Sequence, residues 1–416
     1  MTYLLSALSL AVAVPIGVFF LECCAALLPA RRRCDAAGPR PRVDVLIPAH
    51  DEAAVIEATL ASVTSELRAG DRVLVVADNC TDATAELARR SGVDVVERFD
   101  ATRRGKGYAL DFGLRRLTSE PDDVVVIVDA DCRLAAGTLD HLARAAAATG
   151  RPVQAVYRMT APPRPSPRDV VSSFSVTVKN EARQRGVDRL GVSCTLTGSG
   201  MALPRRLFDL VHLADGNIVE DMRLTFELVR LGRGPVFCPA AVVTAPLPQS
   251  RHASRAQRTR WEHGHLQTLL HFVPRLLGQG LRRCRPSLIA AALDLAVPPL
   301  SLLVLAWCGT ALAAVAAALL GFGLAPCYVS ATSGLLLALS VVAAHARFGH
   351  GSLLAVAAAV PRYVVGKLPI YAGFLFRRQT AWVRTDRDVE PRHAHVALRG
   401  ETSAEVGIPV AAGDLE

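Results

Sequence analysis

Two long apolar tracts lie on either side of a region of mixed sequence, and they limit what this chain can fold into. The first covers residues 4–30, where Glu22 is the charged residue, and the second covers residues 287–346. A helix needs about 20 apolar residues to cross a bilayer, and both tracts exceed that length. With 51% hydrophobic residues, the chain is also too apolar for a disordered protein. We therefore expect membrane helices and a separate folded domain between them.

Arginines directly after the first tract indicate its orientation. Arg31, Arg32 and Arg33 follow the apolar residues, whereas a cleaved signal peptide has its positive charge before them. Because Lys and Arg favour the cytoplasmic side, we expect residues 1–30 to form a transmembrane helix that leads into the cytoplasm. A signal peptide is the alternative, and Glu22 is the residue that fits a membrane helix least well.

The second tract divides at its prolines and charged residues. A leader over residues 287–299 ends at a Pro-Pro pair, and we expect spans near residues 300–321 and 327–345. Residues 351–376 contain Arg and Lys, so an interfacial or re-entrant helix is expected there rather than a third span. Residues 250–286 are basic and then leucine-rich, as is typical of a segment at the membrane surface.

Short β-branched runs alternate with helical patterns in the region between the tracts. The strands are expected at residues 43–47, 72–77, 93–96 and 124–128, and the helices at 52–68, 82–91, 106–118 and 137–148. Apolar strands separated by helices predict an α/β domain with a mainly parallel sheet, covered on both faces. The expected segments are a membrane helix (1–30), this domain (31–249), an interfacial segment (250–286), transmembrane and interfacial helices (287–376) and a basic cytoplasmic tail (377–416).

The net charge of +9 raises nucleic acid as a partner. However, basic clusters such as Arg282, Arg283 and Arg285 flank apolar segments, and the chain contains no nucleic-acid-binding motif. We therefore expect the charge to meet membrane lipid, and no nucleic acid. The ten cysteines form no C-x-x-C motif, so neither a zinc site nor a disulfide framework is indicated, which favours a reducing compartment.

Acidic residues follow three of the expected strands. Glu52 comes after the first strand, Asp78 ends the second, and Asp129 and Asp131 follow the fourth. The carboxyl ends of parallel strands meet at one edge of a sheet, where ligands bind. Any one of these acids has an ordinary explanation as a turn residue, but three at one edge favour a functional site.

Asp129 and Asp131 have the spacing of a metal-binding pair. Positions i and i+2 of an extended segment point the same way, and two adjacent carboxylates favour a hard divalent ion that also contacts phosphates. We therefore expect Mg²⁺ or Mn²⁺ there. A second Asp-x-Asp, at residues 386–388, lies in the basic tail and is interpreted as solvated charge.

Three further features have a structural explanation when each is taken alone. Lys106 lies between glycines before a helix, which favours a phosphate, although Gly-rich turns there are common. Glu220 and Asp221 begin a helix, where acids stabilise the helix dipole. Trp261 lies on the amphipathic segment, where aromatic residues are typical of a membrane interface.

Taken in order, these motifs resemble those of the family 2 glycosyltransferases. The closest group is the membrane-embedded one that includes cellulose, chitin, hyaluronan and poly-N-acetylglucosamine synthases. The resemblance covers residues 43 to about 265, extends to the flanking helices, and implies a GT-A fold, which is Rossmann-like. It rests on seven motifs: P-A-H-D-E (48–52), D-N-C-T-D (78–82), G-K-G (105–107), D-A-D (129–131), T-G-S-G-M (197–201), E-D (220–221) and Q-R-T-R-W (257–261).

The resemblance also implies a role for each matching residue. The nucleotide-sugar side would consist of Pro48, Glu52, Asp78, Asp82, Lys106, Asp129, Gln257 and Arg260. The acceptor side would consist of Gly198, Ser199, Gly200 and Trp261. Asp131, with Asp129, would bind the metal. Asp221 would be the general base, supported by Glu220.

The expected function is inverting, metal-dependent transfer of a hexose or N-acetylhexosamine at the cytoplasmic membrane. The donor would be a nucleotide sugar, UDP-linked, and the acceptor a polysaccharide or oligosaccharide, with export or polymerisation subunits as candidate partners. One alternative is a lipid acceptor, either a polyprenyl phosphate or a glycolipid. Another is a non-catalytic membrane scaffold, and a transporter is disfavoured because the second tract offers only Asp294 as an intramembrane charge.

Overall fold

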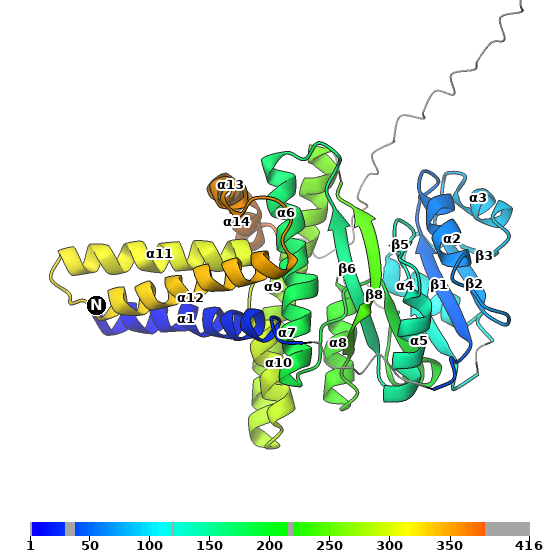
Figure 1. Ribbon diagram of the computed structural model, residues 1–416, viewed down its shortest axis with the longest axis horizontal. Coiled ribbons are helices and arrows are strands. Elements are labelled where there is room, and N and C mark those ends of the chain that lie inside the picture. The colour runs from blue at the N-terminus through cyan, green and yellow to red at the C-terminus, as the bar shows by residue number, and fades with distance from the viewer. Residues whose placement is uncertain (1, 30–37, 119, 215–218, 249, 379–416) are drawn as a thin grey trace, which may run out of the picture.

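Three long helices project from one side of a mixed α/β body in the computed structural model (Figure 1). The structure describes residues 2–29, 38–118, 120–214, 219–248 and 250–378. Arg31, Arg32 and Arg33, and nearly all of the expected tail, lie outside these residues. The projecting helices are α1 (Thr2–Ala25), α11 (Leu300–Leu319) and α12 (Ala325–Phe348).

The body is built on one eight-stranded sheet with the order β3-β2-β1-β4-β7-β6-β8-β5. The four strands expected from the sequence are parallel neighbours, and β6 is parallel to β8; β7 is antiparallel to both β4 and β6, and β5 to β8. The α/β fold class is therefore confirmed. The strands are β1 (Val43–Ala49), β2 (Arg72–Asp78), β3 (Asp94–Arg98), β4 (Val124–Ile127), β5 (Arg133–Leu134), β6 (Val153–Thr160), β7 (Met201–Pro204) and β8 (Val236–Pro246).

Helices cover both faces of the sheet because successive strand residues point to opposite sides. In β1, Val45 and Ile47 pack with one group of helices, whereas Leu46 packs with the other. The first group includes α2 (Ile56–Thr64) and α5 (Thr138–Thr149), and the second includes α4 (Lys106–Leu114) and α8 (Glu220–Arg230). Helix α3 (Thr84–Arg90) and the short 3-10 helix Arg205–Leu210 complete the body.

A second layer of helices lies between the sheet and the projecting bundle (Figure 1). It contains α6 (Pro167–Thr177), the π-helix Val178–Ala182 and α7 (Arg183–Leu190), which form one continuous rod. It also contains α9 (Arg251–Arg282) and α10 (Pro286–Ala296), which cover most of the expected surface segment and leader.

By length and composition, four helical segments of the described chain could cross a membrane. Three are α1, α11 and α12. The fourth, Leu353–Phe376, is divided at Gly366 and Lys367 into α13 (Leu353–Val365) and α14 (Leu368–Phe376). Helix α13 packs against α6 and α11, and α14 packs against α9 (Figure 1). Whether this pair spans the bilayer or lies at its surface, as the sequence suggests, stays a prediction.

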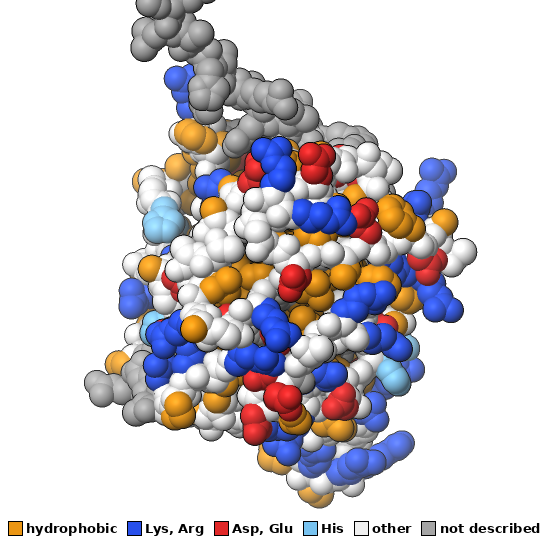
Figure 2. Space-filling view, turned by 90° about the vertical axis from the view of Figure 1, so that its right-hand side faces the viewer, with side chains coloured by type: hydrophobic (Ala, Val, Ile, Leu, Met, Phe, Trp, Pro, Cys, Tyr) orange, Lys and Arg blue, Asp and Glu red, His pale blue; other side chains and the backbone are white. Residues whose placement is uncertain are grey.

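The end of the body that faces away from the projecting helices has a more polar surface than those helices. Figure 2 shows this end, and there blue and red side chains intermingle over the whole face with small apolar strips between them. Charges of both signs dispersed in this way are typical of a surface in contact with water.

Buried charges fasten the body to α1. Arg183 Nε donates to Glu22 Oε2 at 2.6 Å, and Arg183 Nη2 donates to Asp294 Oδ1 at 2.7 Å. The helices also touch closely, since a Cβ on Gly186 would lie 2.0 Å from the Glu22 carbonyl oxygen. Glu22, which fitted a membrane helix poorly from sequence, therefore has a partner on α7.

Candidate functional site

A cavity of about 240 Å³ lies at the carboxyl ends of β1, β2 and β4. Twelve of the residues singled out from the sequence line it, although they come from seven separate motifs. They are Pro48, Glu52, Asp78, Lys106, Asp129, Asp131, Gly198, Glu220, Asp221, Gln257, Arg260 and Trp261. The edge of the sheet collects them because parallel strands deliver their following loops to the same side.

Lys106 lies at the centre of the charges in this cavity. Its ammonium pairs with Asp129, lies 3.7 Å from Glu220 Oε1 and donates a hydrogen bond of 2.7 Å to the Gly198 carbonyl. Burial disfavours the ammonium, but the carboxylates of Asp129 and Glu220 outweigh it and raise the pKa of Lys106 above its ordinary value. The site thus holds a permanent positive charge, that of Lys106, among several acids.

Glu220 and Asp221 form the first turn of α8. Burial, opposed by Lys106, raises the pKa of Glu220 to about 7, so this carboxyl takes up a proton more readily than an exposed glutamate. Asp221 Oδ1 accepts a hydrogen bond of 2.7 Å from the Met222 backbone N–H. That bond fixes the orientation of the Asp221 carboxylate at the cavity wall.

The loop that follows Thr197 is held by a glutamine that the sequence analysis did not identify. Gln154, fully buried on β6, accepts from the Thr197 N–H at 2.9 Å and donates to the Ser199 carbonyl at 2.9 Å. Ser199 Oγ in turn accepts from the Asp129 N–H at 3.0 Å. A polar residue inside a strand has no sequence signature of this role, because its partners lie more than 40 positions away.

Three residues expected at the site, Asp82, Ser199 and Gly200, do not line the cavity. Ser199 is buried beneath the cavity lining. Position 200 requires a glycine, because a Cβ there would lie 2.8 Å from Val243 Cγ2. Asp82 Oδ2 accepts from the Ala53 N–H at 3.1 Å. These residues position the loops around the cavity rather than face it.

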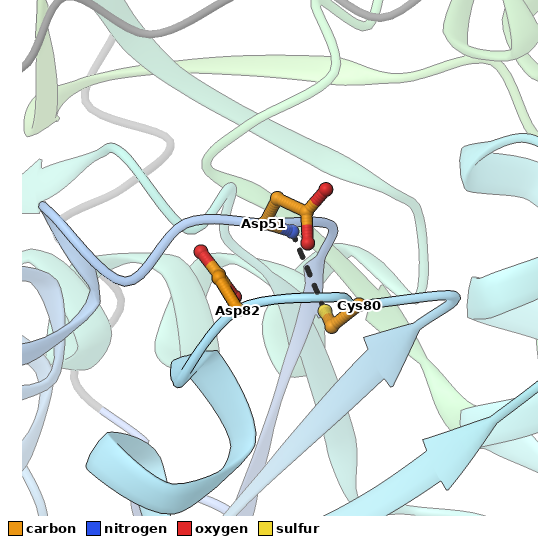
Figure 3. A group of neighbouring side chains, drawn as sticks. All are labelled: Asp51, Cys80 and Asp82. Atoms are coloured by element: carbon orange, nitrogen blue, oxygen red, sulfur yellow. Dashed lines mark hydrogen bonds between the residues drawn. The ribbon is translucent and has the colours of Figure 1, made fainter.

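Asp82 also belongs to a group with Asp51 and Cys80 whose spacing would suit a metal ion (Figure 3). The two carboxylates already accept from backbone N–H groups: Asp51 Oδ1 from Thr81 and Asp82 Oδ1 from Thr84. Burial raises the pKa of Cys80 to about 11, so its sulfur is a neutral thiol. The group is therefore explained as turn structure.

Asp129 and Asp131 are better suited to a cation. Their carboxylate oxygens lie within 4.8 Å of each other and of the Cys132 sulfur. Burial raises the pKa of Cys132 well above its usual value, so the available donors are carboxylate oxygens. Oxygen donors beside a cavity fit a hard ion such as Mg²⁺ or Mn²⁺, and the Lys106 ammonium already balances part of their charge.

Asp78 is the last residue of β2 and lines the cavity. Arg98 Nη1 donates to Asp78 Oδ1 at 2.6 Å, and Asn79 Nδ2 donates to the same oxygen at 2.9 Å. Burial raises the pKa of Asp78, against the pull of Arg98. Among the described residues Asp78 Oδ2 accepts no hydrogen bond, so it can accept one from a donor in the cavity.

One wall of the cavity was not anticipated. Tyr157 and Met159 of β6, with Val176, Lys179 and Asn180 of the rod, complete the lining. Their only trace in the sequence is that Lys179 is one of three lysines in the chain.

Replacing Gly198 by Ala is expected to lower turnover by about 10²-fold, because the added methyl group would occupy space between Lys106 and Asp221 and misplace a bound substrate, and small misplacements of reacting groups cost that much. The φ of Gly198 is +90°, and the added Cβ would lie 3.4 Å from Lys106 Nζ and 3.5 Å from Asp221 Oδ2. Gly92→Ala is the matched control, since its φ is +76° with nothing within 4 Å. Steady-state rates and melting temperatures of both variants separate site crowding from backbone strain. Equal activity in Gly198→Ala and Gly92→Ala would contradict the placement of Gly198 beside the reacting groups.

Comparison with known proteins finds glycosyltransferases that resemble this chain. The profile described as "Glycosyltransferase like family 2" matches residues 39–264. The probable glycosyltransferase YdaM of Bacillus subtilis (strain 168) is 26% identical over 253 residues, 56% of this chain and 57% of that protein. The uncharacterized glycosyltransferase Rv0539 of Mycobacterium tuberculosis (strain ATCC 25618 / H37Rv) is 37% identical over 100 residues, 24% of this chain and 41% of that protein. The chain thus spans about half the length of these curated relatives.

Among solved structures, the mannosyltransferase PcManGT from Pyrobaculum calidifontis, in complex with GDP-Man and Mn²⁺, has a similar fold. The TM-score is 0.56 at 23% identity, and the match covers 90% of this chain and 100% of that one. The shared fold therefore includes most of the helices outside the α/β body.

Proposed function

This chain belongs to glycosyltransferase family 2, and from that premise we propose that it moves a hexose or N-acetylhexosamine from a nucleotide sugar to an acceptor at a membrane. The observation that supports this most directly is the cluster of Lys106, Asp129, Glu220 and Asp221 around Gly198 in one cavity. A cation, an acid at a strand end and two acids at a helix start are groups that such a transfer can use to stabilise the leaving group and to take a proton.

Donor binding would use two groups of residues that line the cavity. Asp78, with Pro48 and Glu52 beside it, would contact the nucleoside, and Asp78 Oδ2 would accept from the base. Lys106 and Arg260 would bind the diphosphate, because cations near phosphate oxygens form charge-assisted hydrogen bonds. We expect a UDP sugar, and GDP sugars belong in the test because the solved structure of similar fold holds GDP-Man.

Asp129 and Asp131 would hold Mg²⁺ or Mn²⁺. When bound, the ion supplies positive charge that stabilises the departing diphosphate. The PcManGT structure contains Mn²⁺, and the oxygen donors of this chain fit such an ion.

The chemical step is one displacement at the anomeric carbon. The acceptor oxygen forms a bond to that carbon while the bond to the diphosphate oxygen breaks, and the electron pair leaves on the diphosphate. Asp221 takes the proton of an acceptor hydroxyl, and Lys106 stabilises the charge on the leaving group. A single displacement inverts the anomeric centre, so an α-linked donor gives a β-linked product.

The acceptor would meet the site at the membrane surface. Trp261 lies on α9 at the cavity wall, and the four apolar segments would place the body on the cytoplasmic side of the inner membrane. A growing polysaccharide or oligosaccharide is one acceptor class, with export or polymerisation subunits as partners. A lipid acceptor is the other.

Asp131→Asn is expected to weaken metal-dependent donor binding by about tenfold or more, because a carboxylate ligand becomes a neutral amide. The experiment is nucleoside-diphosphate release by detergent-purified protein over a panel of UDP and GDP sugars, with Mn²⁺, Mg²⁺ or EDTA. Mn²⁺ binding measured by calorimetry gives a second readout. Asp209→Asn, an exposed acid in a surface ion pair, is the control.

Release from one donor that stops with EDTA would support the proposal and identify the sugar. An unchanged Mn²⁺ titration in Asp131→Asn would remove the metal assignment. Absence of nucleotide binding in the wild-type protein would instead favour a non-catalytic scaffold.

A further inference from the structure

A second cavity, of about 100 Å³, lies between the rod and the membrane-type helices. Phe19 of α1, Leu303 of α11 and Tyr363 of α13 contribute to its wall, and each belongs to a different candidate membrane span. Pro298 and Pro299, which separate α10 from α11, complete the apolar side. An apolar chain in a bilayer could reach this cavity without passing through water.

The second cavity borders the first. Val176, Lys179 and Trp261 line both of them, so the apolar space ends where the cavity with Asp221 begins. A molecule that fills both would have an apolar part among the membrane-type helices and a polar head beside the catalytic acids.

Lys179 is the cation at this junction. It lies in the π-helix Val178–Ala182. Two contacts hold this helix against β6: Asn180 Nδ2 donates to the Tyr157 carbonyl at 3.2 Å, and Arg158 donates two hydrogen bonds to the Glu181 carboxylate. Widened helical turns of this kind occur frequently at functional sites. Burial lowers the pKa of Lys179, and the more distant charges of Asp221, Glu262 and Asp294 compensate only in part.

Two of the other cations that line the second cavity have anionic partners, whereas among the described residues none is found for Lys179 or Arg258. Arg183 pairs with Glu22 and Asp294, and Lys367 pairs with Glu262. In the part of the chain that the structure describes, Lys179 Nζ makes no hydrogen bond or ion pair shorter than 4.0 Å. A buried ammonium in that state is costly unless an anion joins it.

A histidine provides a second polar group with unused capacity. His265 is 6% exposed, lines the same cavity, and its Nε2 has no hydrogen-bond partner among the described residues. Burial, together with the charges of Lys179 and Arg183, holds the pKa of His265 well below its usual range. The imidazole is therefore neutral, and because its other nitrogen hydrogen-bonds to the backbone of Leu295 and Val297, Nε2 can accept one more hydrogen bond, for example from a protonated phosphate oxygen.

We propose that the second cavity binds a long-chain lipid phosphate as acceptor, with the phosphate at Lys179 and His265 and the chain along α1, α11 and α13. This rests on the proposed function, because it names the acceptor class of the same site. The combination of an unpaired ammonium, a free imidazole nitrogen and an apolar wall favours a phosphate-bearing lipid over a neutral polysaccharide.

The bonds that form and break at the anomeric carbon are the same for the two sources of such a phosphate, but the attacking group differs. With a lipid-linked sugar, a hydroxyl attacks the anomeric carbon and its proton passes to Asp221. With a lipid monophosphate, a phosphate oxygen anion attacks and has no proton to give. In both, the nucleoside diphosphate leaves with the electron pair of the broken bond.

The test compares a lipid with and without its phosphate. The full chain in phosphatidylcholine nanodiscs is titrated with a polyprenyl monophosphate, the matching polyprenol, and a polyprenyl-diphosphate-linked sugar, with binding followed by tryptophan fluorescence. We expect wild-type protein to bind the phosphate forms about ten- to a hundredfold more tightly than the alcohol, as for a charged hydrogen bond. Lys179→Met should remove this preference and Lys179→Arg should keep most of it, whereas Arg90→Met, the loss of an exposed charge, should change nothing.

Product formation distinguishes the sources. Sugar transfer to the monophosphate or to the lipid-linked sugar identifies which phosphate lipid is the acceptor, and either supports the proposal. Equal binding of phosphate and alcohol, or a preference unchanged in Lys179→Met, overturns it even if nucleotide still binds. Loss of nucleotide binding in the wild-type protein would instead overturn the proposed function.

Discussion

Replacing Asp221 by Asn is expected to lower sugar transfer by about 10²–10⁴-fold, the usual contribution of a general base, while nucleotide binding stays close to that of the wild type. The amide oxygen can still accept from the Met222 N–H, which the Asp221 carboxylate does at 2.7 Å. It cannot take the proton of an acceptor hydroxyl. Nucleoside-diphosphate release and nucleotide affinity, measured on the same preparation, give the two quantities.

Asp122→Asn is the matched control for this variant. Asp122 is an exposed acid whose partner is Arg206 at the surface, and it precedes β4, at the end of that strand away from the cavity. It should leave both quantities unchanged. Turnover in Asp221→Asn within a few-fold of wild type, with an acceptor that reacts through a hydroxyl, would remove Asp221 as the base and leave Glu220 as the acid to examine.

Arg183→Met is expected to destabilise the protein by about 3–5 kcal/mol, because it leaves Glu22 and Asp294 buried without their counter-charge. In detergent, the apparent melting temperature should fall by roughly 5–15 °C. The interaction joins α1, α7 and α10, so limited proteolysis between α1 and the body should also become faster.

A surface pair provides the comparison. Arg115 pairs with Asp111 along α4 and is 73% exposed, so Arg115→Met should cost about 0.5 kcal/mol or less. The double variant Glu22→Gln/Arg183→Met should recover part of the loss, since it removes one of the two stranded acids. If Arg183→Met melts no lower than Arg115→Met, the buried cluster does not hold the helices together.

The sequence predicted the first half of the sheet well because the signals there are local. The expected strand at residues 43–47 lies within β1, and the expected helix at 106–118 begins at the same residue as α4. Strand β7 was not anticipated: four residues long, it pairs antiparallel with β4, whose partner positions are more than 70 residues away. Short strands with distant partners have no periodicity to recognise.

The residues of the candidate site also fall into those that local sequence signals predict and those that they do not. Motif residues such as Asp129 and Asp221 follow strands or begin helices, so their meeting point follows from topology. Gln154 and Lys179 lie inside elements, and their roles depend on tertiary contacts with the loop at Thr197 and with the cavity beside α1. Glu22 stood out in the sequence, but only the packing of α7 shows which charge it meets.

The buried pair between Glu22 and Arg183 also has a consequence for how the protein is made. A ribosome adds Arg183 161 positions after Glu22, and Asp294 another 111 positions later. During that interval the first helix contains an acid whose counter-charge does not yet exist. Lasting attachment of α1 to the body must therefore await translation of α7, and full attachment that of α10, so α1 is translated before the body but reaches its final contacts only after it.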